Sequence, residues 1–187
     1  MVTMSGAPWS VTLDYSHDAA FALVVRDALG ITDPLGLAAV HPPQALTVDP
    51  AVRASSGIDQ LWQHWWNRVT SPARREETGL PALPDGPLGR VVEENFTVLH
   101  QWSAARKREV AHASKPTGAT PRVRDVLREY ERTTGIRLGG FQLRVTALPV
   151  AGSVFLPLDD DRVLVSIALL IDRAEYLQQV LAHVSRA

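Results

Sequence analysis

The chain has 187 residues, a formal net charge of −1 at pH 7 and no cysteine. This length predicts a single domain over residues 1–187 with a buried hydrophobic core, and the near-neutral charge argues against an electrostatic partner for the whole molecule. The lack of cysteine excludes disulfide bonds and thiolate metal sites, and no apolar run is long enough to cross a membrane.

A half-buried strand is predicted near the start of the chain, over residues 9–15, because apolar and polar residues alternate there. Its apolar residues are Trp9, Val11, Leu13 and Tyr15. Ser16 follows as a helix cap, and the helix that it begins ends at Gly30. If this strand joins the strands near the other end of the sequence, one sheet contains both ends of the chain.

Proline-rich, irregular connections near residues 31–56 and 71–87 separate the next helices. Long loops inside compact domains are usually functional or contain short elements of their own. Between these connections, apolar residues at helical spacing predict a helix over residues 57–69. A long helix is predicted over residues 88–112, and a further helix begins at its cap, Thr120.

The last third of the chain predicts three strands followed by a helix. We expect strands near residues 141–149, 154–157 and 162–167, with the acidic run Asp159–Asp161 as the turn of a hairpin. Asp172, with a glutamate three residues later, forms a capping box for the final helix. Together the elements predict an α+β fold, with a small, mainly antiparallel sheet of three or four strands covered by four or five helices.

A cluster of aromatic residues supplies the candidate ligand-binding side chains. Aromatic faces bind apolar and cationic ligands, so the tryptophans of the helix over residues 57–69 could form the floor of a pocket. Three aromatic residues at helical spacing are more typical of a stripe buried in a core, which is the interpretation that the pattern favours. The candidate ligand-binding residues are Trp62, Trp65, Trp66, Trp102 and His100.

No catalytic residue is predicted. The run from Ser16 through His17 to Asp18 contains the residue types of a catalytic triad, but neighbours in sequence rarely point at one another, and helix capping explains the serine and the aspartate. An enzyme of the hydrolase type remains an alternative if dispersed groups meet in the fold. Those groups are Asp14, Asp18, Glu93, Glu94, His100 and Asp159–Asp161. We predict no metal site and no cofactor.

Basic residues concentrate between residues 101 and 137, where nine lysines and arginines stand against four acids, which gives this segment a charge of +5. A basic patch is the electrostatic footprint of nucleic-acid binding, which is the second alternative. However, acids and arginines spaced three residues apart are typical of a solvated, ion-paired helix face, and no nucleic-acid-binding motif accompanies the patch. We therefore do not expect a nucleic-acid partner.

The strands and helix of the last third resemble the core of the H-E-x-x-H zincin metallopeptidases. In those enzymes a strand borders the active-site cleft, and the next helix carries two zinc-binding histidines with a glutamate base between them. His183 matches the first ligand, whereas Val184 stands in the place of the glutamate and Ala187 in the place of the second histidine. The resemblance implies a zincin-like scaffold without peptidase chemistry, because one imidazole without a general base does not activate a zinc-bound water.

These observations favour a non-catalytic protein that binds another protein or a small molecule. The two proline-rich connections and the tryptophan-rich helix supply candidate surfaces. If Trp62 or Trp66 is exposed, a homodimer or another protein partner is favoured, because large exposed aromatic patches are typical of interfaces. The first ten residues lack the regions of a signal peptide, and arginine far outnumbers lysine, so we expect a cytoplasmic protein from a GC-rich bacterial gene, with no membrane partner.

Overall fold

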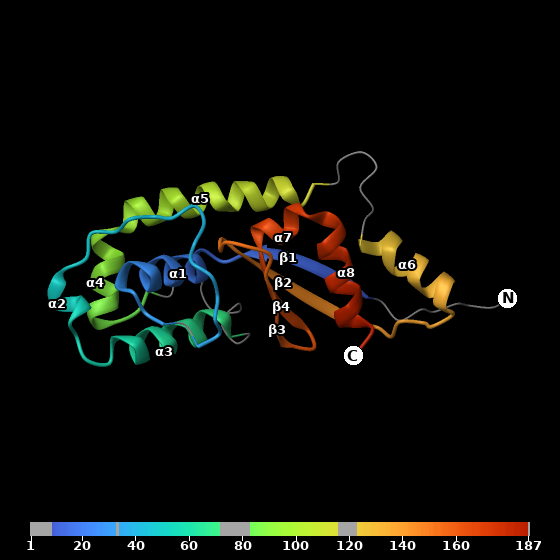
Figure 1. Ribbon diagram of the computed structural model, residues 1–187, viewed down its shortest axis with the longest axis horizontal. Coiled ribbons are helices and arrows are strands. Elements are labelled where there is room, and N and C mark those ends of the chain that lie inside the picture. The colour runs from blue at the N-terminus through green and yellow to red at the C-terminus, as the bar shows by residue number, and fades with distance from the viewer. Residues whose placement is uncertain (1–8, 33, 72–82, 116–122, 187) are drawn as a thin grey trace. The chain divides into compact units, whose positions relative to one another are not determined.

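The computed structural model describes residues 9–32, 34–71, 83–115 and 123–186 (Figure 1). Within these ranges the chain forms eight helices and one four-stranded sheet, which confirms the predicted α+β fold. None of the helices in these ranges combines the length and apolar character needed to cross a bilayer. The chain divides into two compact units. Because compact units of one chain can unfold together or apart, the single domain predicted over residues 1–187 stays a prediction.

Unit 1 contains the sheet and comprises the residues up to Tyr15, Val110–Ala147 and the residues from Gly152 onward. Its strands follow the order β1-β2-β4-β3. β1 runs parallel to β2, and β3 runs antiparallel to β4, so the sheet is mixed rather than mainly antiparallel. The elements are β1 (Ser10–Tyr15), α6 (Val123–Thr134), β2 (Gln142–Leu148), β3 (Phe155–Asp159), β4 (Arg162–Ser166), α7 (Ile167–Ile171) and α8 (Arg173–Val184).

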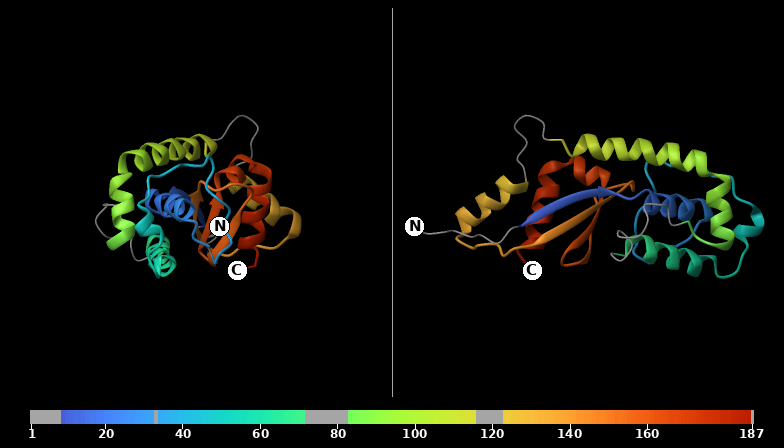
Figure 2. Two further views of the ribbon diagram at one scale, coloured as in Figure 1. Left: turned by 60° about the vertical axis from the view of Figure 1, so that its left-hand side comes forward. Right: turned by 180° about the vertical axis from the view of Figure 1, so that it is seen from behind.

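The two faces of the sheet differ in polarity. Val11 and Leu13 of β1 lie beside the buried Leu143 and Val145 of β2, on one face. In Figure 1, α7 and α8 lie in front of the sheet. Seen from behind, in the right panel of Figure 2, no helix crosses β1 and β2. The face that no helix covers carries the exposed residues of β1, which are Ser10, Thr12 and Asp14.

The turn between β3 and β4 and the cap of the final helix lie where the sequence predicts them. The turn between β3 and β4 lies at the acidic run Asp159–Asp161. Ser166 ends β4 one residue earlier than predicted, because its hydroxyl accepts a hydrogen bond from the amide of Leu169 at 3.1 Å and so starts α7. Asp172 caps α8 by accepting a hydrogen bond from the amide of Glu175, also at 3.1 Å.

Unit 2 is helical and comprises Ser16–Glu109 and Leu148–Ala151. Its elements are α1 (His17–Leu29), α2 (Pro50–Arg53), α3 (Ile58–Thr70), α4 (Gly86–Glu94) and α5 (Phe96–Ala113), the last of which continues into unit 1. Ser16 caps α1 as predicted, with its hydroxyl 3.1 Å from the amide nitrogen of Ala19. The largest fully buried side chains of the unit are Trp62, Trp65, Trp66, Phe21, Leu23, Leu88, Leu99 and Leu148.

The single helix predicted over residues 88–112 is wrong, because the chain leaves the helical conformation at Asn95, where φ is −109° and ψ is 11°. The amide group of Asn95 bonds the backbone of Thr47 on both sides, donating to its carbonyl at 2.8 Å and accepting from its N–H at 2.9 Å. It also donates to the carbonyl of Val91 at 2.9 Å. This buried side chain therefore joins the connection of residues 31–56 to the break between α4 and α5.

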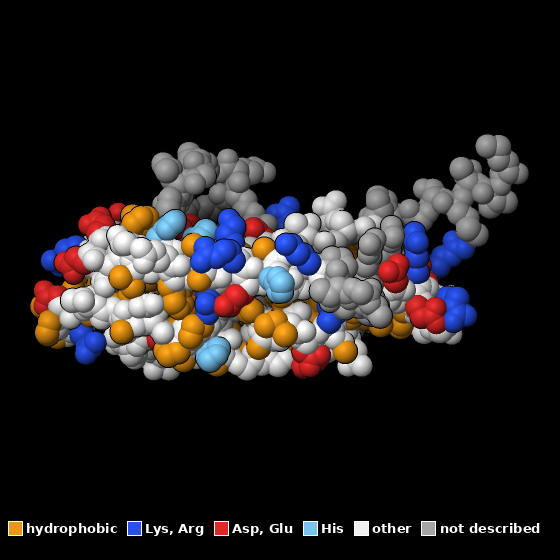
Figure 3. Space-filling model, turned by 90° about the horizontal axis from the view of Figure 1, so that it is seen from above, with side chains coloured by type: hydrophobic (Ala, Val, Ile, Leu, Met, Phe, Trp, Pro, Cys, Tyr) orange, Lys and Arg blue, Asp and Glu red, His pale blue; other side chains and the backbone are white. Residues whose placement is uncertain are grey.

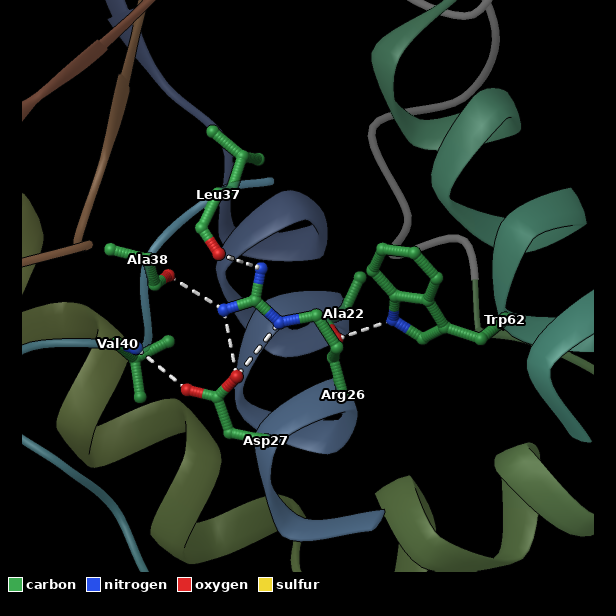
Figure 4. Close-up of polar contacts among 7 residues, drawn as sticks. All are labelled: Ala22, Arg26, Asp27, Leu37, Ala38, Val40 and Trp62. Atoms are coloured by element: carbon green, nitrogen blue, oxygen red, sulfur yellow. Dashed lines mark hydrogen bonds and ion pairs between the residues drawn. The ribbon is translucent and has the colours of Figure 1, made fainter. Parts of the chain in front are cut away.

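A charge pair between a buried arginine and a partly exposed aspartate holds the same connection against α1 (Figure 4). Arg26 is 2% exposed, and its guanidinium donates hydrogen bonds to the carbonyl oxygens of Leu37 at 3.1 Å and Ala38 at 2.7 Å. It also forms an ion pair with Asp27 at 2.7 Å. The second carboxylate oxygen of Asp27 accepts the amide of Val40 at 2.6 Å. Paired in this way, a buried charge is tolerated and fixes the path of the loop.

Several predictions lie outside the described residues. They concern the cap of α6 at Thr120, most of the proline-rich connection of residues 71–87, and the position of Ala187. The other predicted connection contains the short helix α2, in agreement with the expectation that long loops contain short elements.

Candidate functional site

The three tryptophans predicted as a pocket floor lie in the core of unit 2. Trp62, Trp65 and Trp66 are 0%, 1% and 1% exposed. Trp62 stacks on Trp66 with 5.6 Å between ring centroids, and its Nε1 donates to the carbonyl of Ala22 on α1 at 2.7 Å (Figure 4). These side chains pack α3 against α1. Because they are buried, the argument for a homodimer from exposed tryptophans does not apply.

The other two predicted ligand-binding residues lie on α5. Trp102 is 8% exposed, and its Nε1 donates to the carbonyl of Pro42 at 3.1 Å. His100 is exposed and stacks on Phe96 and His17, with 5.9 Å and 6.0 Å between ring centroids. The five predicted residues are therefore divided between α3 and α5, and their role as one ligand-binding set stays a prediction.

A histidine and a serine that sequence reasoning did not connect meet where α1 begins. His17 Nδ1 lies 2.8 Å from Ser103 Oγ, and Ser103 is fully buried. Burial, followed by the nearby charges of Lys107 and His100, lowers the pKa of His17 below its ordinary value, while Asp18 acts in the opposite direction. A hydroxyl that solvent does not reach is no nucleophile for an external substrate, so we interpret the pair as a hydrogen bond that holds α1 against α5.

The lowered pKa of His17 predicts a loss of stability in acid. The unfolded chain takes up a proton at this residue near pH 6.5, whereas the folded chain takes it up only at lower pH. His17 therefore contributes stability that is present above about pH 6.5 and is lost as the pH falls through its folded-state pKa. In urea unfolding between about pH 7.5 and about pH 5, His17→Gln should lose less unfolding free energy than the wild type. Equal losses would contradict this, and His64→Gln, at an exposed histidine of α3, is the control.

The groups of the enzyme alternative fall in both units: Asp14 and Asp159–Asp161 in unit 1, and Asp18, Glu93, Glu94 and His100 in unit 2. Glu93 and Glu94 are exposed at the end of α4, and the break at Asn95 separates them from the helix of His100. Asp18 and His100 both lie near enough to His17 to affect its pKa. The hydroxyl that His17 contacts, that of Ser103, is buried rather than accessible, so this arrangement does not favour a hydrolase.

His183, the residue that matches the first zincin ligand, packs α8 against the hairpin of β3 and β4. Its Nε2 lies 3.0 Å from the carbonyl oxygen of Asp160, and its ring meets the ring of Phe155 edge-on with 5.9 Å between centroids. Because a carbonyl oxygen only accepts hydrogen bonds, Nε2 carries the proton and presents no lone pair to a metal. Packing explains this histidine, and the zincin resemblance stays a prediction.

Six of the nine basic residues of the segment 101–137 lie on α5 and α6, and Arg122 lies outside the described residues. Arg106 pairs with Glu109 on α5 at 2.8 Å, and Arg132 pairs with Glu129 on α6 at 2.5 Å. Both pairs are three residues apart on one helix, which is the arrangement predicted for a solvated, ion-paired face. Partial neutralisation of this kind weakens a phosphate-binding footprint, so the geometry adds no support for a nucleic-acid partner.

Exposed apolar side chains do not form one broad patch on the face shown in Figure 3, where hydrophobic side chains lie dispersed among polar and charged ones. Single exposed apolar residues are normal on protein surfaces. In the described part of the chain, the large ones are Leu35, Leu61, Phe96, Val98, Ile136 and Ile171. The edge of the sheet is a candidate binding surface of a different kind.

β1 presents the backbone groups of alternate residues at the outer edge of the sheet. The amide of Ser10 donates to the carbonyl of Phe141 at 2.9 Å, so the backbone of Ser10 faces β2. Because successive residues of a strand point their N–H and C=O groups to opposite sides, Thr12 also faces β2, whereas Val11 and Leu13 face away. No strand of the described ranges pairs with this outer side. Its last amide, that of Tyr15, donates to Asp14 Oδ1 at 2.8 Å.

The two edges of the sheet differ in how they resist further pairing. β3, at one edge, contains Pro157, and its register with β4 shifts between Pro157 and Asp159. It ends at an ion pair of 2.7 Å in which Arg162 lowers the pKa of Asp159. Proline, a bulge and charge are the devices by which proteins protect edge strands. β1 contains neither proline nor bulge, because its six residues pair with β2 in unbroken register.

Comparison with known proteins found no family model, no curated protein and no solved structure that matches this chain.

Proposed function

We propose that this chain is a protein-binding domain that takes an extended segment of its partner onto the outer edge of β1 as an added strand. The observation that carries the proposal is the contrast between the two edges: β3 has the features that prevent strand addition, and β1 lacks them. In strand addition, backbone hydrogen bonds supply much of the affinity, and alternate side chains supply the specificity. The expected binding surface is therefore the outer edge of β1, and the expected partner is an extended segment of chain.

The side chains of β1 define the pattern that a partner segment should have. Val11 and Leu13 are half-buried on the helix-covered face, so partner residues beside them should be apolar. Ser10, Thr12 and Asp14 are exposed on the other face, so partner residues beside them should be polar. The proposed partner is therefore an alternating segment of about five or six residues, the usual length of a strand.

The proposal predicts that Val11→Pro abolishes most of the binding at this edge. Proline removes the outward amide of Val11 without touching the hydrogen bonds between β1 and β2, and proline is tolerated on edge strands. The probe is a display library of random peptides selected on the immobilised wild-type chain. Selected peptides should bind Val11→Pro at least about tenfold more weakly than the wild type, because several backbone hydrogen bonds of about 1 kcal/mol each depend on a continuous edge.

Val11→Thr is the matched control, because it keeps the amide and the β-branched shape of the side chain. It should bind the selected peptides about as well as the wild type. Equal binding to the wild type and to Val11→Pro would place the peptides elsewhere on the chain and contradict the proposal. Circular dichroism of the variants checks that both remain folded.

A further inference from the structure

We propose that the partner segment is β1 of a second copy of this chain, paired antiparallel about a two-fold axis at Thr12. The inference rests on the proposed function and names its partner. The two four-stranded sheets would then form one continuous sheet across the axis. Closed two-fold dimers are the commonest form of protein self-association, and two identical strands related by such an axis through their edges run antiparallel.

The backbone of β1 fits this register. With Thr12 opposite Thr12 of the second copy, Val11 lies opposite Leu13 of the second copy, and Leu13 opposite its Val11. Val11 and Leu13 are the residues whose N–H and C=O groups face outward, so the two pairs exchange four backbone hydrogen bonds. The backbone of Thr12 faces β2, so the pair on the axis is of the non-hydrogen-bonded kind, as alternation in an antiparallel ladder requires.

The side chains fit the same register, because residues of compatible type lie at equal distances on either side of Thr12. Ser10, a hydroxyl donor, lies opposite Asp14 of the second copy, a carboxylate acceptor, and this pair occurs twice. The two Thr12 side chains meet on the axis on the same polar face, and pairs of threonines are favourable across strands. Val11 and Leu13 meet on the opposite face, where both are only half-buried in a single copy.

A register centred on Leu13 fits less well. It places Val11 opposite Tyr15 of the second copy, but the amide of Tyr15 already donates to Asp14 Oδ1 at 2.8 Å. Forming that register would exchange an existing hydrogen bond for a new one, so it gains less. The register centred on Thr12 keeps this bond and uses the amides of Val11 and Leu13 for the new ladder.

The protected edge at β3 limits the proposed assembly to two copies of the chain. Once two copies join at β1, the remaining edges of the combined sheet are two β3 strands, each with Pro157 and a shifted register. An assembly whose free edges accept no strand ends at the dimer instead of growing into a fibre. A second copy is therefore the partner that accounts both for the unprotected edge at β1 and for the protected edge at β3.

Disulfide cross-linking tests the register, because the natural chain contains no cysteine. In the proposed dimer the Cα atoms of the two Thr12 residues lie about 4.5 Å apart, within the range that a disulfide spans. Those of the two Ser10 residues lie about 14 Å apart, because each is two residues from the axis. Under mild oxidation of dilute protein, Thr12→Cys should become a covalent dimer, and Ser10→Cys, at an equally exposed position, should not.

Two lysine variants test the same register without a covalent bond. Thr12→Lys places like charges opposite each other on the axis and should raise the dimer dissociation constant at least about fivefold, as measured by sedimentation. Ser10→Lys adds the same charge opposite Asp14 of the second copy and should leave that constant unchanged or lower it. Cross-linking of both cysteine variants to the same extent, or a stronger effect of Ser10→Lys, would overturn the register.

The inference and the proposed function fail separately. A wild-type chain that is monomeric by native mass spectrometry at all concentrations, with no cross-linking of Thr12→Cys, refutes the dimer. If selected peptides still depend on Val11 in that case, the edge of β1 binds a different protein and the proposed function stands. If they do not, both conclusions are wrong.

Discussion

Replacing Arg26 with methionine should lower the free energy of unfolding by about 2–3 kcal/mol, because it leaves two backbone carbonyls and the carboxylate of Asp27 without their donor. The substitution keeps most of the side-chain volume but removes the donors to the carbonyls of Leu37 and Ala38 and the charge that pairs with Asp27. Chemical unfolding at neutral pH measures the difference. The effect is large because Arg26 is 2% exposed and one of its acceptors, Leu37, is also buried, so water does not readily replace the lost donor there.

Arg53→Met is the matched control. Arg53 also donates to a backbone carbonyl, that of Ala28 at 3.0 Å, but this hydrogen bond is exposed. Its loss should cost less than about 1 kcal/mol. A loss from Arg26→Met that is no larger than the loss from Arg53→Met would show that Arg26 does not hold the connection of residues 31–56. Adding Asp27→Asn to Arg26→Met should recover part of the stability, because it removes the charge left without its partner.

The second large effect is expected from Trp62→Ala, which should cost about 3–5 kcal/mol of unfolding free energy. The indole is fully buried, stacks on Trp66 and donates to the carbonyl of Ala22. Trp62→Phe, which retains most of the apolar volume but not the donor, should cost about 1–3 kcal/mol. Leu61→Ala, at a 45% exposed neighbour on α3, should change stability by less than about 0.5 kcal/mol. Equal losses from Trp62→Ala and Leu61→Ala would contradict the packing described for α3.

The same variant tests whether the two units form one domain. Trp62 lies in unit 2, and the amides of β2 lie in the sheet of unit 1. If residues 1–187 unfold as a single domain, Trp62→Ala should lower the hydrogen-exchange protection of β2 as much as that of α1. If the units unfold independently, protection in β2 should stay at the wild-type level.

Local signals predicted most elements correctly. The alternation in residues 9–15, the acidic turn at Asp159–Asp161 and the caps at Ser16 and Asp172 each act within a few residues of chain. The break at Asn95 could not be predicted, because the sequence around it continues a helical pattern, and the groups that bind its side chain include Thr47, which is far away in sequence. The parallel pairing of β1 with β2 is equally non-local.

The candidate site was missed for the same physical reason. Sequence reasoning looked for reactive or aromatic side chains, and the tryptophans that it selected are buried because their helical stripe faces α1. The outer edge of β1 consists of backbone groups, and every strand of the chain carries such groups. Which strand lies at an edge of the sheet depends on the order β1-β2-β4-β3, which no local pattern contains. A usable signal was present: β3 contains a proline and β1 does not.

The parallel pairing of β1 with β2 has a consequence for synthesis on the ribosome. β1 is made before Ser16–Glu109, the long continuous part of unit 2, and β2 is made after it. Helical segments with local contacts fold quickly, whereas strand pairs that are distant in sequence form late. Unit 2 can therefore begin to fold while the chain is still growing, and β1 stays unpaired on both sides until β2 has left the ribosome. Neighbouring ribosomes on one message expose the same strand during that interval, which gives β1 of one nascent chain an early opportunity to meet β1 of another.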